Sequence, residues 1–248
     1  MPFFATSFAA PLLLCVSAAA QDNALELFHK MQRALGGADT IAGVQDFDQT
    51  VKATAWRPNG ELMGDVRKRV RWVKPNYLRL DQAGPGDTFV LYFDGKSGWE
   101  ILPDGHQADL SGGELDFARK YLDHLLLRIW LADRTAGYAI TSPDRNIVRV
   151  STNRTRADQL DITLDPGTSL PLKEASISLA DPAHPSPSET QFREWTTVQG
   201  IKFPTRVWVL HNGVKLADIA TEDLKFNAGV RTKDLAAKPT GLKPQMRN

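Results

Sequence analysis

Residues 88–102, TFVLYFDGKSGWEIL, decide the fold class of this chain. The run from Thr88 to Phe93 is apolar on both faces, which predicts a central strand of a sheet. Residues 94–98 carry an aspartate and two glycines, and they predict a turn into a second strand that begins at Trp99. Two strands joined by so short a turn run antiparallel.

Alternation with a period of two residues continues on both sides of this hairpin. Phe47, Gln49 and Val51 point one way while their polar neighbours point the other, and Arg67 to Val73 repeats the pattern. Further strands are expected at residues 137–140, 147–151, 160–164, 172–179, 191–197, 203–210 and 215–225. Turns about every ten residues favour a meandering sheet. The sequence therefore predicts a mostly β (α+β) domain, a strongly curved antiparallel half-barrel of about ten or eleven strands.

Two helices are expected beside the sheet. Residues 22–35 place Leu25, Phe28, Met31 and Leu35 on one stripe, and two glycines end this N-terminal helix. Residues 113–134 are apolar almost all round, which predicts one long helix that is buried or covers an apolar surface. We expect it to cover the concave side of the sheet.

The ends of the chain look different from the middle. Residues 1–20 are apolar, carry no charged side chain and end in small residues, which predicts a secretory signal peptide and an exported, periplasmic protein. Lipid anchoring at Cys15 is the less favoured alternative, because Leu14 stands where lipoprotein processing requires a small residue. Residues 21–230 then form one domain, and the basic residues 231–248 form a flexible tail.

Composition excludes several classes of protein. The 248 residues include 30 Lys and Arg against 29 Asp and Glu, a net charge of +1 that excludes a strongly basic nucleic-acid binder. The single cysteine excludes an internal disulfide and a multi-cysteine zinc site. The five histidines are scattered, with none at ligand spacing, and no nucleophile elbow or phosphate loop is present. We therefore expect no enzyme, no cofactor and no metal.

The order of the turns carries a resemblance. Residues 94–99 (DGKSGW), 164–173 (LDPGTSLPLK), 200–204 (GIKFP) and the Phe226-Asn227 pair resemble, in order and spacing, segments of the periplasmic lipoprotein-carrier family (LolA/LolB-like). The resemblance covers residues 24–230. It implies an open antiparallel half-barrel with helices closing its concave side, and an apolar space that binds lipoprotein acyl chains or other lipid-like ligands.

Aromatic and aliphatic side chains of the hairpin and the long helix are the candidate pocket. The candidate ligand-binding residues are Trp72, Phe89, Leu91, Phe93, Trp99, Leu122, Leu125, Ile129 and Trp130. An ordinary packed core explains the same residues. Arg67, Arg69 and Arg71 are candidates for contact with lipid head groups or an acidic partner, and the alternative is an edge strand kept soluble by its charge.

Two functions remain open at this stage. The first is an exported, non-catalytic binding protein that holds lipid or lipoprotein acyl chains, with a role in outer-membrane lipoprotein sorting. The second is an interaction or sensor module of the same fold, with a filled interior and an envelope or outer-membrane protein as partner. Neither hypothesis involves nucleic acid.

Overall fold

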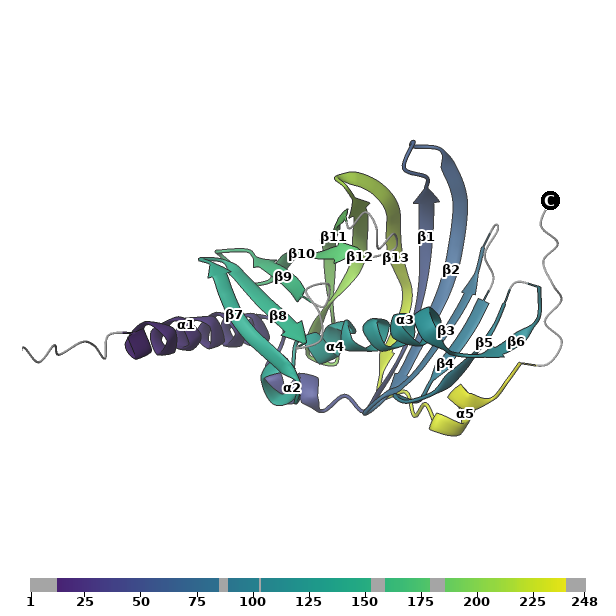
Figure 1. Cartoon of the computed structure of the whole chain (residues 1–248), viewed down its shortest axis with the longest axis horizontal. Helices are drawn as coiled ribbons and strands as arrows, with labels where there is room; N and C mark the ends of the chain where they lie inside the picture. Colours follow the sequence, from purple (N-terminus) through teal and green to yellow (C-terminus); the bar gives the residue numbers. More distant parts are fainter. Residues whose placement is uncertain (1–12, 85–88, 103, 153–158, 179–185, 240–248) are drawn as a thin grey trace, which may run out of the picture.

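The computed structural model describes residues 13–84, 89–102, 104–152, 159–178 and 186–239. They build a single antiparallel sheet of thirteen strands in the order β6-β5-β4-β3-β2-β1-β13-β12-β11-β10-β9-β8-β7 (Figure 1). The strands are β1 Asp46–Trp56, β2 Leu62–Val73, β3 Tyr77–Ala83, β4 Phe89–Phe93, β5 Gly98–Ile101, β6 Gln107–Asp109, β7 Tyr138–Asp144, β8 Ile147–Thr152, β9 Gln159–Leu164, β10 Pro171–Ser178, β11 Ser186–Val198, β12 Ile201–His211 and β13 Val214–Phe226. The described strands β6 and β7 pair on one side only, so the sheet is curved but not closed.

One long-range pairing joins the two halves of the sheet. β1 pairs with β13 over nearly its whole length, from Phe47 opposite Phe226 to Ala55 opposite Ala217. Every other neighbouring pair joins consecutive strands, whereas the helical segment between β6 and β7 connects the two edges of the sheet. The predicted antiparallel meander is confirmed. The described residues contain more strands than the ten or eleven expected, and the three-residue β6 is too short to show an alternating pattern.

The turns behave as their residue types require. In the β4–β5 turn, Asp94 Oδ1 accepts hydrogen bonds from the N–H groups of Lys96 and Ser97, both at 2.8 Å. In the β9–β10 turn, Asp165 Oδ1 accepts from the N–H of Thr168 at 2.7 Å. Such side-chain bonds replace a regular backbone turn and set the spacing between strands.

The N-terminal helix packs against the β7 edge of the sheet. Helix α1 spans Leu13–Ala34, longer than the predicted 22–35, and its buried stripe includes Phe28 and Met31. It lies against β7, and the short α2 (Ala38–Ala42) follows it (Figure 1). Buried Gln32 donates from Nε2 to Trp130 O at 2.9 Å and to Asp133 Oδ1 at 2.8 Å. Residues 1–12 of the predicted signal peptide and the Cys15 side chain lie outside the described part.

The predicted long helix is divided in the structure. Residues 112–134 form α3 (Gly112–Asp123), α4 (Leu126–Ile129) and the 3₁₀ turn η1 (Ala132–Arg134). The break lies at Leu125, whose backbone is extended with φ −60° and ψ 129°. Tyr138 Oη donates to Asp123 O at 2.8 Å, and Arg128 Nη1 donates to Pro75 O at 2.8 Å. The break lets α3 cross in front of the sheet while α4 enters the core (Figure 1).

The main core lies on the concave side, between the sheet and the helices. Its fully buried members include Phe28, Phe93, Leu80, Trp130 and Ile162.

On the convex side, Leu235 of α5 (Thr232–Ala236) is fully buried, and α5 lies against β3 and β4 (Figure 1). The segment predicted as a flexible tail therefore begins with a docked helix, whose Leu235 side chain is removed from water. Residues 240–248 lie outside the described part.

Candidate functional site

A cavity of about 940 Å³ lies between α3 and the concave face of the central strands. Small-molecule sites commonly measure roughly 300–1,000 Å³, so this volume is large enough for a ligand. The strands contribute Phe47, Gln49, Val51, Lys68, Val70, Glu174, Thr190, Phe192, Phe203, Pro204, Thr205, Val207, Ile219 and Thr221. The helical segment contributes Gly113, Asp116, Phe117, Arg119, Lys120, Tyr121, Asp123, His124, Leu125, Leu126 and Leu127.

The shape of the cavity follows from the topology. The central strands β1, β11, β12 and β13 are eleven to thirteen residues long, and α3 crosses only part of their concave face. Val207 and Ile219, opposite each other on β12 and β13, are half-buried and face the cavity. Because apolar side chains gain free energy when they leave water, these walls favour an apolar ligand.

The cavity opens to solvent along α3. Phe117 lines it and its side chain is 48% exposed. Lys68 of β2 places its Nζ 4.6 Å from the ring centroid of Tyr121, and Arg119 Nη1 donates to Asp116 Oδ1 at 3.1 Å. The opening is therefore polar and charged, whereas the walls behind it are mostly apolar.

Among the lining residues contributed by the strands, Glu174 is the acidic one. Glu174 of β10 is 8% exposed, and its Oε1 is buried without a hydrogen-bond partner in the described part of the chain. Burial raises the pKa of Glu174 from 4.5 to about 8, because the charged form loses its hydration. The carboxyl is therefore predominantly neutral at pH 7.

The structure brings most predicted pocket residues together, but in the packed core. Trp72, Leu91, Phe93, Leu122, Leu125, Ile129 and Trp130 are buried members of the concave core, and Phe89 packs against it. Of these, Leu125 lines the cavity. Two others pack against residues that line it: the ring centroid of Trp130 lies 5.7 Å from that of Phe203, and that of Trp72 lies 6.0 Å from that of Phe47.

Trp99 lies apart from the other predicted pocket residues. It pairs with Tyr92 across β4 and β5, so it shares the face opposite to Leu91 and Phe93. There it forms a small convex cluster with Val90 and Ile101.

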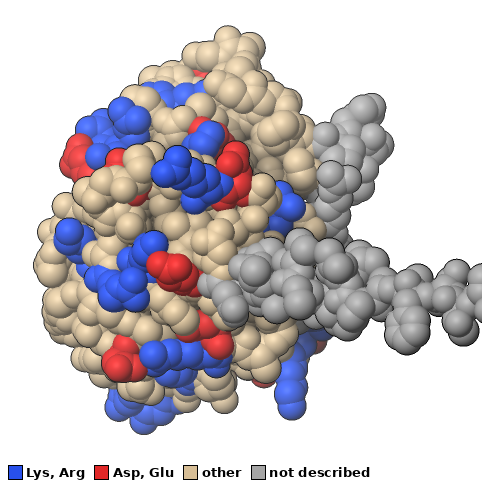
Figure 2. Space-filling view, turned by 90° about the vertical axis from the view of Figure 1, so that its left-hand side faces the viewer, with Lys and Arg blue, Asp and Glu red and all other residues tan. Residues whose placement is uncertain are grey.

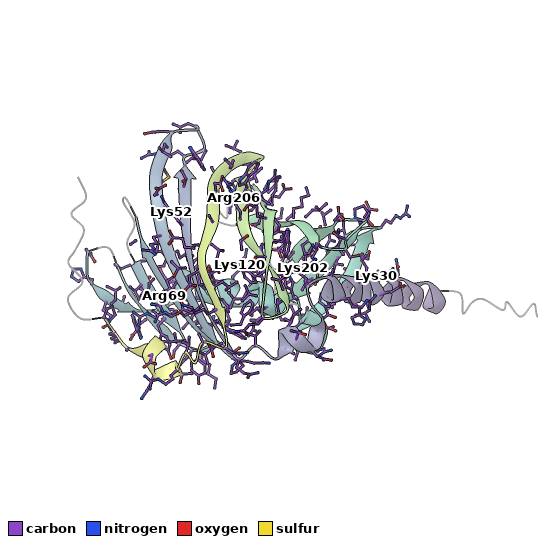
Figure 3. All side chains as sticks on the ribbon, turned by 180° about the vertical axis from the view of Figure 1, so that it is seen from behind. Lys30, Lys52, Arg69, Lys120, Lys202 and Arg206 are labelled. Atoms are coloured by element: carbon purple, nitrogen blue, oxygen red, sulfur yellow. The ribbon has the colours of Figure 1, made fainter. Side chains whose placement is uncertain are left out.

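The three candidate arginines of β2 also lie on the convex face. Arg67 pairs with Glu222 at 2.9 Å, Arg69 with Asp48, and Arg71 with Asp81. Figure 3 labels Lys52, Arg69 and Arg206 on β1, β2 and β12. The alternative of a charged edge strand is wrong, because β2 is paired on both sides, with β1 and with β3.

Charge of both signs is spread over one face of the molecule. Figure 2 shows basic and acidic side chains interspersed on the face viewed from the α1 end.

The described part of the chain contains no group of three or more His, Cys, Asp or Glu side chains that could hold a metal ion. None of the helices in the described ranges is long and apolar enough to cross a membrane.

The cavity walls contributed by β10 to β13 were not predicted as a site. The alternation of Phe47, Gln49 and Val51 was visible in the sequence, and so was that of Phe203, Thr205 and Val207. That signal indicates an inward face but does not separate a packed interior from an open one. The sequence did not indicate that Glu174 is buried, because a single acidic residue in a strand is ordinarily exposed to solvent.

Comparison with solved structures supports the fold. A domain described as an outer membrane lipoprotein-sorting protein from Vibrio parahaemolyticus superposes with a TM-score of 0.58 at 13% identity, covering 87% of this chain and 97% of that one. A DUF1329 family protein from Desulfovibrio piger gives 0.57 at 13% identity, covering 88% and 96%. A LolA superfamily protein from Nitrosomonas europaea gives 0.56 at 13% identity, covering 87% and 97%.

No family model and no curated protein matches the sequence. The three structures share the LolA-like fold with this chain across most of their length. The predicted resemblance to lipoprotein carriers is thereby confirmed at the level of the fold.

Proposed function

We propose that this protein is an exported, non-catalytic binding protein that holds the acyl chain of a lipid or lipoprotein between α3 and the concave face of its sheet. The observation that carries the proposal is the apolar cavity of about 940 Å³ in a fold shared with a lipoprotein-sorting domain. Each methylene group removed from water contributes about 0.8 kcal/mol, so an acyl chain binds there without specific polar contacts.

The proposal includes export to the periplasm through the leader at residues 1–20. A role in outer-membrane lipoprotein sorting is its specific form, and an envelope protein that delivers or accepts the lipid is the expected partner. The interaction module with a filled interior is less well supported, because half-buried Val207 and Ile219 face unfilled space.

The direct test is extraction of the protein, purified after export, with organic solvent and mass spectrometry of the extract. We expect the extract to contain a lipid or fatty acid in an amount close to one molecule per protein. After removal of lipid, the protein should bind a fluorescent long-chain fatty acid. An extract without lipid, together with no binding of the fatty acid, would refute the proposal.

A pair of variants ties binding to the cavity. Val207→Trp adds an indole in the middle of the apolar wall and should weaken binding of the fluorescent fatty acid at least tenfold. Val214→Trp adds the same bulk at a 41% exposed position at the start of β13 and should leave binding unchanged. Equal affinity of the two variants would show that the ligand binds elsewhere.

A further inference from the structure

Glu174 lies where the packed core ends and the cavity begins. Across the sheet it pairs with Ile162 of β9 on one side and with Thr190 of β11 on the other. Ile162 is fully buried in the core, whereas Thr190 lines the cavity. Directly opposed residues in a sheet have side chains about 5 Å apart on the same face, so the Glu174 carboxyl stands next to the Thr190 side chain at the inner wall.

One oxygen of this carboxyl is buried without a hydrogen-bond partner in the described residues. Glu174 Oε1 is buried and makes no hydrogen bond within the described residues, although buried polar groups in folded proteins are almost always paired. Leaving such a group unpaired destabilises a folded protein. A binding site gives a reason to retain it, because a bound ligand can supply the missing partner.

The lysine and arginine side chains of the cavity do not fill this role. Lys68, Arg119 and Lys120 line the part of the cavity formed by β2 and α3, away from β10, and Glu174 Oε1 has no hydrogen-bond partner in the described part of the chain. Burial alone accounts for the raised pKa of Glu174, without a contribution from a neighbouring charge. A neutral carboxyl both donates and accepts hydrogen bonds, so its natural partner is a neutral oxygen group rather than a second buried charge.

We propose that the ligand carries a hydrogen-bonding oxygen, as a hydroxyl or an ester, within the apolar part that enters the cavity, and that Glu174 recognises this oxygen. The protein then prefers oxygen-bearing acyl chains over plain ones. This inference rests on the proposed function, since it names the chemical class of the ligand held in the same cavity.

The test compares stearic acid with a series of stearic acids that each carry one hydroxyl group, at different carbons. Binding is measured by displacement of a fluorescent fatty acid from lipid-free protein. One or more hydroxylated chains should bind the unmodified protein about three- to tenfold more tightly than stearic acid, the gain from one net hydrogen bond. The carbon that gives the largest gain measures how deep Glu174 lies along the chain.

Three variants test whether the preference for hydroxylated chains depends on Glu174. Glu174→Leu should abolish it while stearic acid still binds, and Glu174→Gln should keep part of it, because an amide also donates and accepts. Glu189→Leu is the control, since Glu189 is one residue from Thr190, faces the convex side and pairs with Lys173 at 2.6 Å; it should keep the full preference.

The outcomes separate this inference from the function on which it rests. Equal binding of plain and hydroxylated chains by the unmodified protein, or a preference that survives in Glu174→Leu, overturns the inference and leaves acyl-chain binding intact. Failure of every fatty acid to bind overturns both.

Discussion

Replacing Glu174 by glutamine should change how the stability of the protein depends on pH. The carboxyl has a pKa of about 8 in the folded protein and 4.5 as its ordinary value. Between these values the folded state keeps the proton while the unfolded state releases it. The unmodified protein therefore loses stability as pH rises from about 4.5 to 8, whereas the glutamine side chain has no proton to release.

The magnitude follows from the width of that interval. At about 1.4 kcal/mol per pH unit, ionisation of Glu174 costs about 5 kcal/mol of the free energy of unfolding by pH 8. This is an upper limit, because any water that reaches the carboxylate lowers the cost of its charge. The two proteins should have nearly equal stability at pH 4, and Glu174→Gln should be more stable by about 2–5 kcal/mol at pH 8.

Urea unfolding of the lipid-free proteins, followed by circular dichroism at pH 4, 6 and 8, measures this difference directly. All other titrating groups are shared, so they cancel in the comparison. Glu189→Gln is a control of opposite sign, because Lys173 lowers the pKa of Glu189 and its ion pair stabilises the fold above pH 4.5. A difference between Glu174→Gln and the unmodified protein that stays constant across the three pH values would refute a neutral buried carboxyl.

Three further substitutions test how the scaffold is held. Leu235→Ala should lower the free energy of unfolding in urea by about 2–5 kcal/mol, because the Leu235 side chain of α5 is fully buried. An unchanged free energy of unfolding would mean that α5 is not docked. Gly36→Ala should lower the melting temperature far more than Gly60→Ala, since a Cβ at Gly36 would lie 2.1 Å from Gly200 O whereas nothing lies within 4 Å at Gly60; equal shifts would contradict this packing. Arg79→Ala should cost about 1.5–3 kcal/mol and speed proteolytic cleavage near residue 235, because the guanidinium of buried Arg79 donates to Leu235 O at 3.1 Å; unchanged cleavage would argue against that anchor.

Local pattern predicted the elements of the fold well where the pattern is strong. The hairpin around Asp94 and the alternation of Val70 and Trp72 with the arginines of β2 required only the two-residue period and turn chemistry. The break at Leu125 could not be predicted in this way, because the helix propensity of residues 113–134 is continuous. Contacts from distant residues, Tyr138 and Pro75, stabilise the ends of α3 and α4 at that break.

The candidate site also could not be predicted fully from local sequence pattern. Core and pocket residues have the same apolar composition, so the sequence grouped Trp130 and Phe93, which are packed, with Leu125, which faces the cavity. The convex position of Trp99 follows from the register of Tyr92 opposite Trp99, which the length of the turn between β4 and β5 sets.

The sequence by itself determined the antiparallel β class, the positions of most turns, and the inward face of strands such as β1. These depend on interactions between residues close in the chain, which leave a periodic trace. Only the tertiary structure decided that Phe47 meets Phe226 across the junction of β1 and β13, and that α3 leaves part of the concave face uncovered. It also decided that Glu174 Oε1 is buried with no hydrogen-bond partner among the described residues. Burial depends on side chains that are distant in sequence, and the local pattern carries no information about them.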